Sequence, residues 1–291
     1  MNDILSRARE FIFVHGRLLE RRIFQARFEH ASKEHVERAV GAYQNRDGGF
    51  GHALEPDLRC PNSQPIFVEV GLAALEDVNK RSPGLAEAAC GYLRSVSGSK
   101  VLVPAILEEA LHHPHAGHWK ASFWRAPSLN PSLGLCGLLH FHGVSDDWLS
   151  NLSEVCIEQL TANMPTEAHT LRGAVRFATH LSDRPKAAQL LQVIAEALPQ
   201  AEYFIPDAPV RSYGLTPLDF APRPEAPMRE AFSTMVIDSH LDDLLQRQQS
   251  DGGWPITWEA PGPAAECEWR AIRTLDAVST LAAYGILPHT A

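Results

Sequence analysis

An imidazole, two carboxylates and a guanidinium lie within eight residues of one another in segment 46–64. They are His52, Glu55, Asp57 and Arg59. A neighbouring arginine can keep one carboxyl group ionised while the other stays protonated, as general acid catalysis requires. We predict Glu55 and Asp57 as catalytic residues and His52 and Arg59 as substrate-binding residues. The alternative is that Glu55 or Asp57 caps the next helix and that Arg59 neutralises it.

A second set of charged and aromatic residues lies near the carboxyl end of the chain. Trp258 precedes Glu268, Trp269 and Arg270. We predict Glu268 as a further catalytic residue and the other three as substrate-binding residues. The alternative for Glu268 is that it stabilises the N-terminus of a helix starting near residue 268, where negative charge is favoured.

Aromatic residues are concentrated in the segments that we expect to be long loops and at the exits of these loops, which together hold five of the six tryptophans. Aromatic faces stabilise cations and also provide flat apolar surfaces in binding cavities. Trp124 is followed by Arg125 and Asn130, a combination that suits a polar or anionic head group. We predict these three residues and Tyr213 as substrate-binding residues. The alternative is that the aromatic side chains fasten loops to the core.

Four histidines follow one another closely at His112, His113, His115 and His118. Clustered imidazoles can bind zinc, copper or nickel. Because a proline and a glycine interrupt the cluster and it contains no acidic or cysteine ligand, we expect a histidine-rich turn without a native metal. The sequence shows no glycine-rich phosphate-binding loop and no nucleophile elbow. We therefore predict no cofactor and no metal site.

Length and composition exclude several classes of protein. The 291 residues allow one large or two small domains. With 35 acidic and 26 basic residues the formal charge is −9, so we expect no nucleic-acid partner. No apolar stretch is long enough to span a bilayer, and the first residues do not resemble a signal peptide. We expect a cytoplasmic protein with a small-molecule ligand and with five reduced cysteines; the sequence predicts no oligomeric state.

Apolar residues recur every three or four positions through most of the chain, which is typical of amphipathic helices. Ser32, Ser145 and Thr166 are expected N-caps, Pro185 a first helical residue, and Gly143 and Gly285 helix ends. The pattern predicts an all-α protein with twelve helices, at 3–13, 17–29, 33–45, 65–79, 84–96, 131–142, 146–162, 167–181, 185–198, 228–234, 236–249 and 268–285. Four long loops join them, at 46–64, 97–130, 199–227 and 250–266.

One motif occurs twice. Residues 44–50 read Gln-Asn-Arg-Asp-Gly-Gly-Phe, and residues 248–254 read Gln-Gln-Ser-Asp-Gly-Gly-Trp. The glutamine can reach backbone groups at a helix end, the glycines allow a turn with positive φ, and the aromatic ring can anchor the turn to the core. The repeat therefore predicts an architectural turn, with four or five helical-pair units between its two copies.

These Gln-x-x-Asp-Gly-Gly-aromatic turns resemble the QW-type repeat of the terpene cyclase and protein prenyltransferase superfamily. The segment 43–61 is also similar to small bacterial proteins described as prenyltransferase-like or squalene-cyclase-like. The resemblance implies a single α/α toroid over residues 1–291, with about six helical hairpins and long loops at one end. It also implies a small cyclase-like or prenyltransferase-like protein that holds a hydrophobic ligand, such as an isoprenoid, in a central cavity and uses acid-initiated chemistry.

The chain departs from that superfamily at its catalytic motifs. It has no Asp-x-Asp-Asp acid motif and no match to the zinc ligands of protein prenyltransferases. Two other functions therefore stay open. One is a carbohydrate-active enzyme of the polysaccharide lyase or glycosidase type, because paired carboxylates and aromatic residues also serve glycoside chemistry. The other is a non-catalytic ligand-binding module.

Overall fold

The computed structural model describes residues 2–97 and 101–288 of the chain. They form two compact units. The central unit comprises Val40–Glu202, and the terminal unit combines the chain up to Ala39 with the chain from Tyr203 onward. The described residues form twelve α-helices and, besides isolated bridges, no β-strand, which confirms the all-α class. The toroidal arrangement of the helices stays a prediction.

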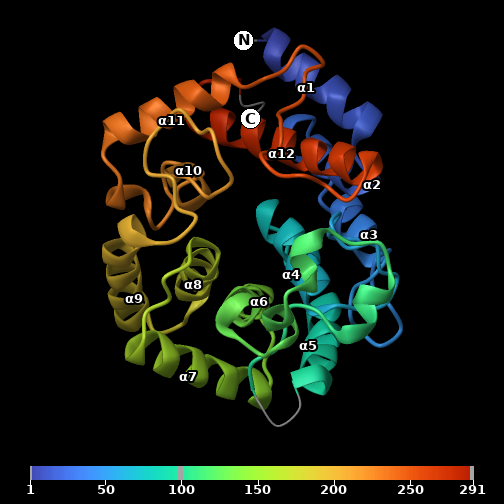
Figure 1. The fold of residues 1–291 in the computed structure, drawn as a ribbon, viewed down its shortest axis with the longest axis vertical. Helices are drawn as coiled ribbons and strands as arrows, with labels where there is room; N and C mark the ends of the chain where they lie inside the picture. The colour runs from blue at the N-terminus through green and yellow to red at the C-terminus, as the bar shows by residue number, and fades with distance from the viewer. Residues whose placement is uncertain (1, 98–100, 289–291) are drawn as a thin grey trace. The chain divides into compact units, whose positions relative to one another are not determined.

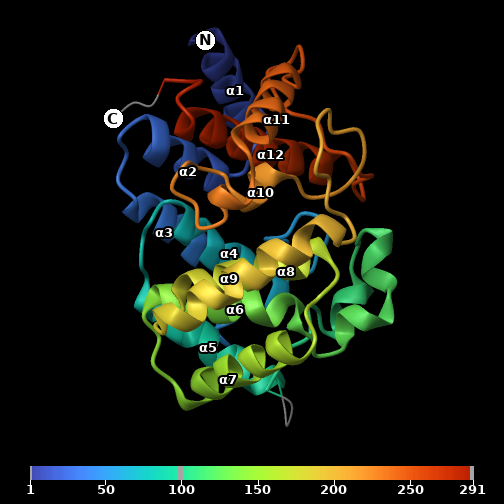
Figure 2. The same ribbon diagram turned by 90° about the vertical axis from the view of Figure 1, so that its left-hand side faces the viewer.

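Helices of the central unit form two layers (Figures 1 and 2). In the first layer α6 (Leu129–His142) lies between α4 (Pro65–Asp77) and α8 (Ala168–His180). In the second layer α5 (Pro83–Ser97), α7 (Asp147–Ala162) and α9 (Arg184–Ala197) pack against the first. The helix α3 (Glu34–Gly41) ends where this unit begins.

Glycine allows α6 and α8 to approach closely. A Cβ atom at Gly137 on α6 would lie 2.9 Å from backbone atoms of Arg176 and Phe177 on α8. A Cβ atom at Gly173 on α8 would lie 3.3 Å from the backbone nitrogen of Gly134 on α6. Larger residues at these positions would force the helices apart. The atoms in the way belong mainly to the helix backbone, which cannot move aside as the end of a flexible side chain can.

The terminal unit is built around α12 (Pro263–Ala283), which packs against α1 (Asn2–His15), α2 (Leu18–Phe28) and α11 (Thr234–Gln246). The short helix α10 (Pro217–Phe220) packs against α11. The buried ring of Trp254 belongs to the core of this unit: its indole N–H donates to the Leu244 carbonyl oxygen at 2.7 Å.

Eleven of the twelve predicted helices occur, with ends shifted by a few residues. The prediction of a helix at 228–234 is wrong, because only a 3₁₀ turn, Arg229–Ala231, forms there. The sequence pattern missed α10, which is short but starts with Pro217 and a capping box between Thr216 and Asp219. The positive φ angles of Gly143 (+82°) and Gly285 (+74°) confirm both as helix ends.

Two predicted N-caps are displaced by one residue. The cap of α7 is Asp146 instead of Ser145, and its side chain accepts a hydrogen bond from the backbone N–H of Trp148. The cap of α8 is Glu167 instead of Thr166. In both cases an acidic side chain provides the cap, and negative charge is favoured at the positive end of the helix dipole.

The first copy of the repeated motif forms a turn between α3 and α4. The side-chain amide of Gln44 donates to the carbonyl oxygens of Gly48 (2.9 Å) and of Leu85 on α5 (3.0 Å). Gly48 has a φ of +88°, and a Cβ there would lie 2.3 Å from the carbonyl oxygen of Ala88. Only glycine fits this position, because any side chain would collide with the backbone of α5.

The second copy repeats this geometry on α1. The amide of Gln248 donates to the carbonyl oxygens of Gly252 and of Ile4, both at 2.9 Å. Gly252 has a φ of +93°, and a Cβ there would lie 2.4 Å from the carbonyl oxygen of Arg7. Ile4 and Arg7 are three residues apart, like the two partners on α5. The second turn therefore packs on α1 through backbone contacts with the same spacing as those of the first turn on α5.

The aspartate and the aromatic residue also act alike in the two copies. Asp47 and Asp251 each accept a hydrogen bond at 3.0 Å from the N–H of the second glycine of their turn. Phe50 and Trp254 are both buried. The prediction of an architectural role for the motif is confirmed.

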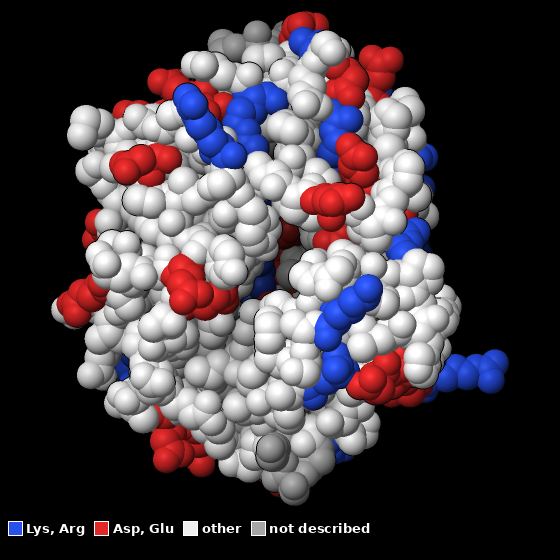
Figure 3. All heavy atoms as spheres, in the orientation of Figure 1, with Lys and Arg blue, Asp and Glu red and all other residues white. Residues whose placement is uncertain are grey.

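The described residues contain no membrane-spanning helix, carry surface charges of both signs and form no disulfide. None of the helices in the described part of the chain is both long and apolar enough to span a bilayer. On the face drawn in Figure 3, the acidic and basic side chains that are described are interspersed. All five cysteines are free thiols, four of them buried and Cys267 half-buried.

Candidate functional site

Segment 51–62 of the central unit buries both predicted catalytic carboxylates. Its two arms are joined by hydrogen bonds from the backbone N–H of His52 to the Pro61 carbonyl oxygen and from that of Ala53 to the Cys60 carbonyl oxygen. Glu55 and Asp57 lie in the turn between the arms and are 6% and 3% exposed. His52, by contrast, is exposed, and Arg59 is half-buried.

The segment that contains the histidines covers this turn. The Asp57 carbonyl oxygen accepts from the N–H of Ala116, and the Arg59 N–H donates to the Pro114 carbonyl oxygen, both at 2.8 Å. His115 Nδ1 lies 2.6 Å from the carbonyl oxygen of His113. In residues 2–97 and 101–288, no three His, Cys, Asp or Glu side chains come together in a way that could hold a metal ion.

Trp124, Arg125 and Asn130 lie in or next to this covering segment. Arg125 forms an ion pair with Glu108 at 2.6 Å. The indole N–H of Trp124 donates to the carbonyl oxygen of His118 at 3.1 Å, and Asn130 lies at the start of α6. A head group that used Arg125 would have to compete with Glu108.

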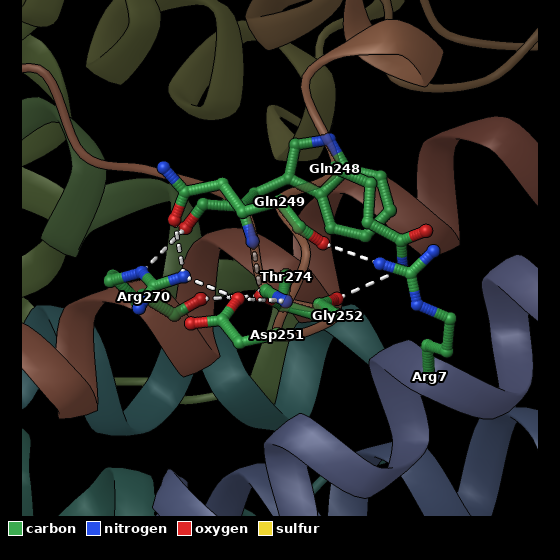
Figure 4. A network of polar contacts seen from close by, with 9 residues as sticks. Arg7, Gln248, Gln249, Asp251, Gly252, Arg270 and Thr274 are labelled. Carbon is green, nitrogen blue, oxygen red and sulfur yellow. Dashed lines mark hydrogen bonds and ion pairs between the residues drawn. The ribbon is translucent and has the colours of Figure 1, made fainter.

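The predicted residues near the carboxyl end divide into two groups within the terminal unit. Arg270 belongs to the second glycine turn, because it donates to Asp251 at 2.8 Å and to Gln249 Oε1 at 2.5 Å (Figure 4). Arg7 donates to the Gln249 carbonyl oxygen from the other side. The rings of Tyr213, Trp258 and Trp269 contact one another in series. Glu268 is half-buried in the first turns of α12.

A cluster that the sequence reasoning missed joins α4 to α8 within the central unit. We call Glu69, Glu76, Arg176 and His180 the Glu69 cluster. Arg176 lies 3.6 Å from Glu69 and 2.9 Å from Glu76, and His180 Nε2 is hydrogen-bonded to Glu76. The side chains of Glu69 and Glu76 are both 18% exposed, so an edge of the cluster stays accessible.

The two carboxyl groups of this cluster have opposite pKa shifts. Burial raises the pKa of Glu69, and the more distant charges of Arg176 and Arg172 only partly oppose this. Burial acts on Glu76 as well, but Arg176 and His180 outweigh it and lower the pKa of Glu76 to about 2. The distances explain the difference, because Arg176 is closer to Glu76 than to Glu69. The cluster therefore pairs a carboxyl group that loses its proton more readily than usual with one that holds its proton more tightly than usual.

Helix α6 closes the cluster on one side. A Cβ atom at Gly134 would lie 2.1 Å from Glu69 Oε1, so the carboxyl group of Glu69 rests against the backbone of α6. The half-buried residues that flank Glu69 along α4 are apolar: Ile66, Val70 and Ala73. The accessible edge of Glu69 therefore lies in an apolar stripe.

A spacing signal for this cluster was present in the sequence. Glu69 and Glu76 are seven residues apart in a segment that is otherwise almost wholly apolar, so they share one face of a helix. On α8 the basic residues His169, Arg172, Arg176 and His180 recur at spacings of three and four. The predicted site residues lie in or next to the expected loops, whereas here the complementary charges lie on two helices.

Comparison with known proteins adds no functional assignment. No protein-family model matches the chain, and no curated protein has a matching sequence. Its function must therefore be argued from the geometry of its own side chains.

Proposed function

We propose that this chain is a cyclase-like acid–base enzyme that acts on a hydrophobic, isoprenoid-like substrate and that Glu69 supplies the proton. The observation that carries the proposal is the arrangement of Glu69 and Glu76 around one guanidinium, 3.6 and 2.9 Å from it, with pKa values shifted in opposite directions. Pairs of carboxyl groups whose surroundings push their pKa values apart are typical of acid–base sites. The apolar stripe formed by Ile66, Val70 and Ala73 supports an apolar substrate.

The raised pKa also indicates which atom receives the proton. A carboxyl group with a raised pKa is a weaker acid than usual, suited to protonating oxygen, as in an epoxide or an alcohol, and too weak for an isolated carbon–carbon double bond. The proton passes from Glu69 to the substrate oxygen, and the C–O bond breaks with its electron pair going to oxygen. The carboxylate left on Glu69 is then stabilised by Arg176, 3.6 Å away.

A direct test is to look for the protonated carboxyl group. Infrared difference spectra of the protein at neutral pH are expected to show a protonated carboxyl band that Glu69→Gln abolishes. Glu87→Gln is the control, because Glu87 is exposed on α5 of the same unit. A spectrum unchanged by Glu69→Gln would contradict the proposed role of Glu69.

A substrate test separates Glu69 from the acids in segment 51–62. Farnesol, geranylgeraniol and their terminal epoxides are incubated with the protein, and the products are identified by gas chromatography and mass spectrometry. We expect conversion of an epoxide, which Glu69→Gln removes and Glu87→Gln retains. Loss of conversion in Glu55→Gln or Asp57→Asn, with Glu69→Gln active, would assign the acid to segment 51–62. No conversion of any compound would contradict the substrate class.

A further inference from the structure

Four aromatic rings are in contact, one after the next, within the terminal unit. Tyr203 contacts Tyr213 with ring centroids 6.0 Å apart, Tyr213 contacts Trp258 at 5.8 Å, and Trp258 contacts Trp269 on α12 at 5.1 Å. The planes meet at 67°, 80° and 83°, so each contact is edge to face. We call these four residues the aromatic chain. An edge-to-face pair covers a face of only one of its two rings, which leaves other faces available for a ligand.

The exposed end of the aromatic chain, formed by Tyr203 and Tyr213, includes a residue with a strained backbone conformation. Tyr203 and Tyr213 are 54% and 46% exposed. Tyr203 has a φ of +60°, a left-handed conformation that a bulky side chain rarely adopts. Two backbone hydrogen bonds hold it there, from the Leu215 N–H to the Tyr203 carbonyl oxygen (2.7 Å) and from the Ile205 N–H to the Leu215 carbonyl oxygen (2.8 Å). Strain of this kind is concentrated at functional sites.

The inner end of the aromatic chain holds two donors without acceptors. In the described part of the chain, neither the indole N–H of Trp258 nor that of Trp269 has a hydrogen-bond partner, although both nitrogen atoms are buried. A buried donor without an acceptor destabilises a protein, and an oxygen atom that reached it would remove the penalty. Both donors therefore favour a ligand that carries oxygen acceptors.

Charges next to the aromatic chain narrow the class of ligand. Glu259 follows Trp258, and Glu266 and Glu268 lie within three residues of Trp269. Two arginines also lie within four residues of Trp269, but Arg270 is already paired with Asp251, and Arg273 with Asp219 and Asp276. The carboxylates therefore disfavour an anion. The indole N–H groups disfavour a cation at the same position, since donors present partial positive charge, and a pure hydrocarbon would leave them without acceptors. A neutral ring that carries hydroxyl groups fits all three conditions.

From these observations we infer that the aromatic chain is a binding site for a neutral sugar ring. The C–H face of the sugar packs on the exposed ring of Tyr203 or Tyr213, and its hydroxyl oxygens accept from the indole N–H groups after a small opening between Tyr213 and Trp258. This inference concerns the terminal unit alone and does not rest on Glu69, so either proposal can fail without the other.

The test is binding of neutral oligosaccharides to the whole protein. Malto-, cello-, xylo- and chito-oligosaccharides are titrated while tryptophan fluorescence and calorimetric heat are recorded. We expect saturable binding of at least one series, weakened about five- to tenfold in Trp258→Phe and in Trp269→Phe, because each keeps an aromatic ring and loses one donor. Tyr203→Ala is expected to weaken binding as well, and its exposed position avoids a folding defect.

Thermal melting distinguishes a binding role from a structural one. Trp258→Phe and Trp269→Phe remove donors that lack acceptors, so their melting temperatures should equal that of the wild type or exceed it. Trp148→Phe is the matched control: it removes a hydrogen bond from the indole N–H to Ser97 Oγ (3.1 Å) in the central unit. It should lower the melting temperature and leave sugar binding unchanged. The inference would be overturned if no oligosaccharide series showed saturable binding. It would also be overturned if Trp258→Phe and Trp269→Phe both bound sugar with wild-type affinity.

Discussion

Arg176 shows how one side chain can contribute to opposite pKa shifts in two neighbouring carboxyl groups. It is closer to Glu76 than to Glu69, so its charge is largely neutralised by Glu76 and only partly offsets the burial of Glu69. His180 adds a second partner on the side of Glu76. Opposite pKa shifts thus arise in two residues of the same type on one helix, seven residues apart.

Removal of Arg176 should therefore destabilise the central unit. Arg176→Met leaves Glu76 with His180 as its remaining partner in the cluster, and breaking a buried ion pair on one side costs roughly 3–5 kcal/mol. Urea unfolding at pH 7 measures the loss. The control is Arg172→Gln, one turn earlier on α8 and exposed, which should change the free energy of unfolding by no more than about 0.5 kcal/mol.

A double variant checks that the loss belongs to the pair. Arg176→Met combined with Glu76→Gln removes the stranded charge, so it should be more stable than the sum of the two single losses predicts. Equal losses in Arg176→Met and Arg172→Gln would show instead that the charge of Arg176 contributes no more than an exposed one.

At the scale of elements, the glycine turns offer a comparison that separates backbone strain from close contact. Gly48 and Gly143 both have positive φ, but a Cβ at Gly48 would lie 2.3 Å from a carbonyl oxygen of α5, whereas a Cβ at Gly143 meets nothing within 4 Å. Gly143→Ala should cost about 1 kcal/mol from the unfavourable φ alone. Gly48→Ala should cost several kcal/mol, because the turn must also move away from α5.

Chemical denaturation of the two alanine variants measures the difference. Gly252→Ala and Gly285→Ala repeat the comparison in the terminal unit, where the close carbonyl belongs to Arg7 and the Cβ at Gly285 again meets nothing within 4 Å. Similar losses within each pair would mean that the turns do not depend on their close approach to α5 and α1.

Local sequence signals predicted most elements and few of the functional contacts. Eleven helices and the two glycine turns follow from periodicity and from one heptapeptide, because both depend on neighbours in the chain. The short helix at Pro217 escaped because four residues show no periodicity. The Glu69 cluster escaped because its ion pairs join residues about one hundred positions apart. Pairing at that distance depends on how α4 and α8 pack against α6.

At the scale of the whole molecule, its two units differ in the groups that respond to acid. Glu76 and Glu167 both lie in the central unit, and hydrogen bonds and positive partners lower the pKa of each to about 2. In the terminal unit the pKa of Asp251 is also lowered, by its hydrogen bond to Arg270. That aspartate side chain is 45% exposed, so solvent screens the interaction and it contributes little to stability.

The central unit should therefore lose stability first as the pH falls. A carboxyl group with a lowered pKa in the folded state contributes stability that is fully present above its ordinary pKa, near 4.5, and is lost as the pH falls toward 2. Glu69 has a raised pKa, so its contribution grows as the pH falls toward its ordinary value and is constant below it; it cannot offset the loss. Hydrogen exchange, corrected for the intrinsic rate at each pH, should show opening of residues 40–202 between about pH 4.5 and 2 while α1 and α12 stay protected. Glu76→Gln should make the central unit less stable at neutral pH and reduce the change in its stability between pH 4.5 and 2, because the variant has already lost the ionised carboxylate and takes up no proton there. Opening of α12 before residues 40–202 would contradict the assignment of the acid-sensitive groups.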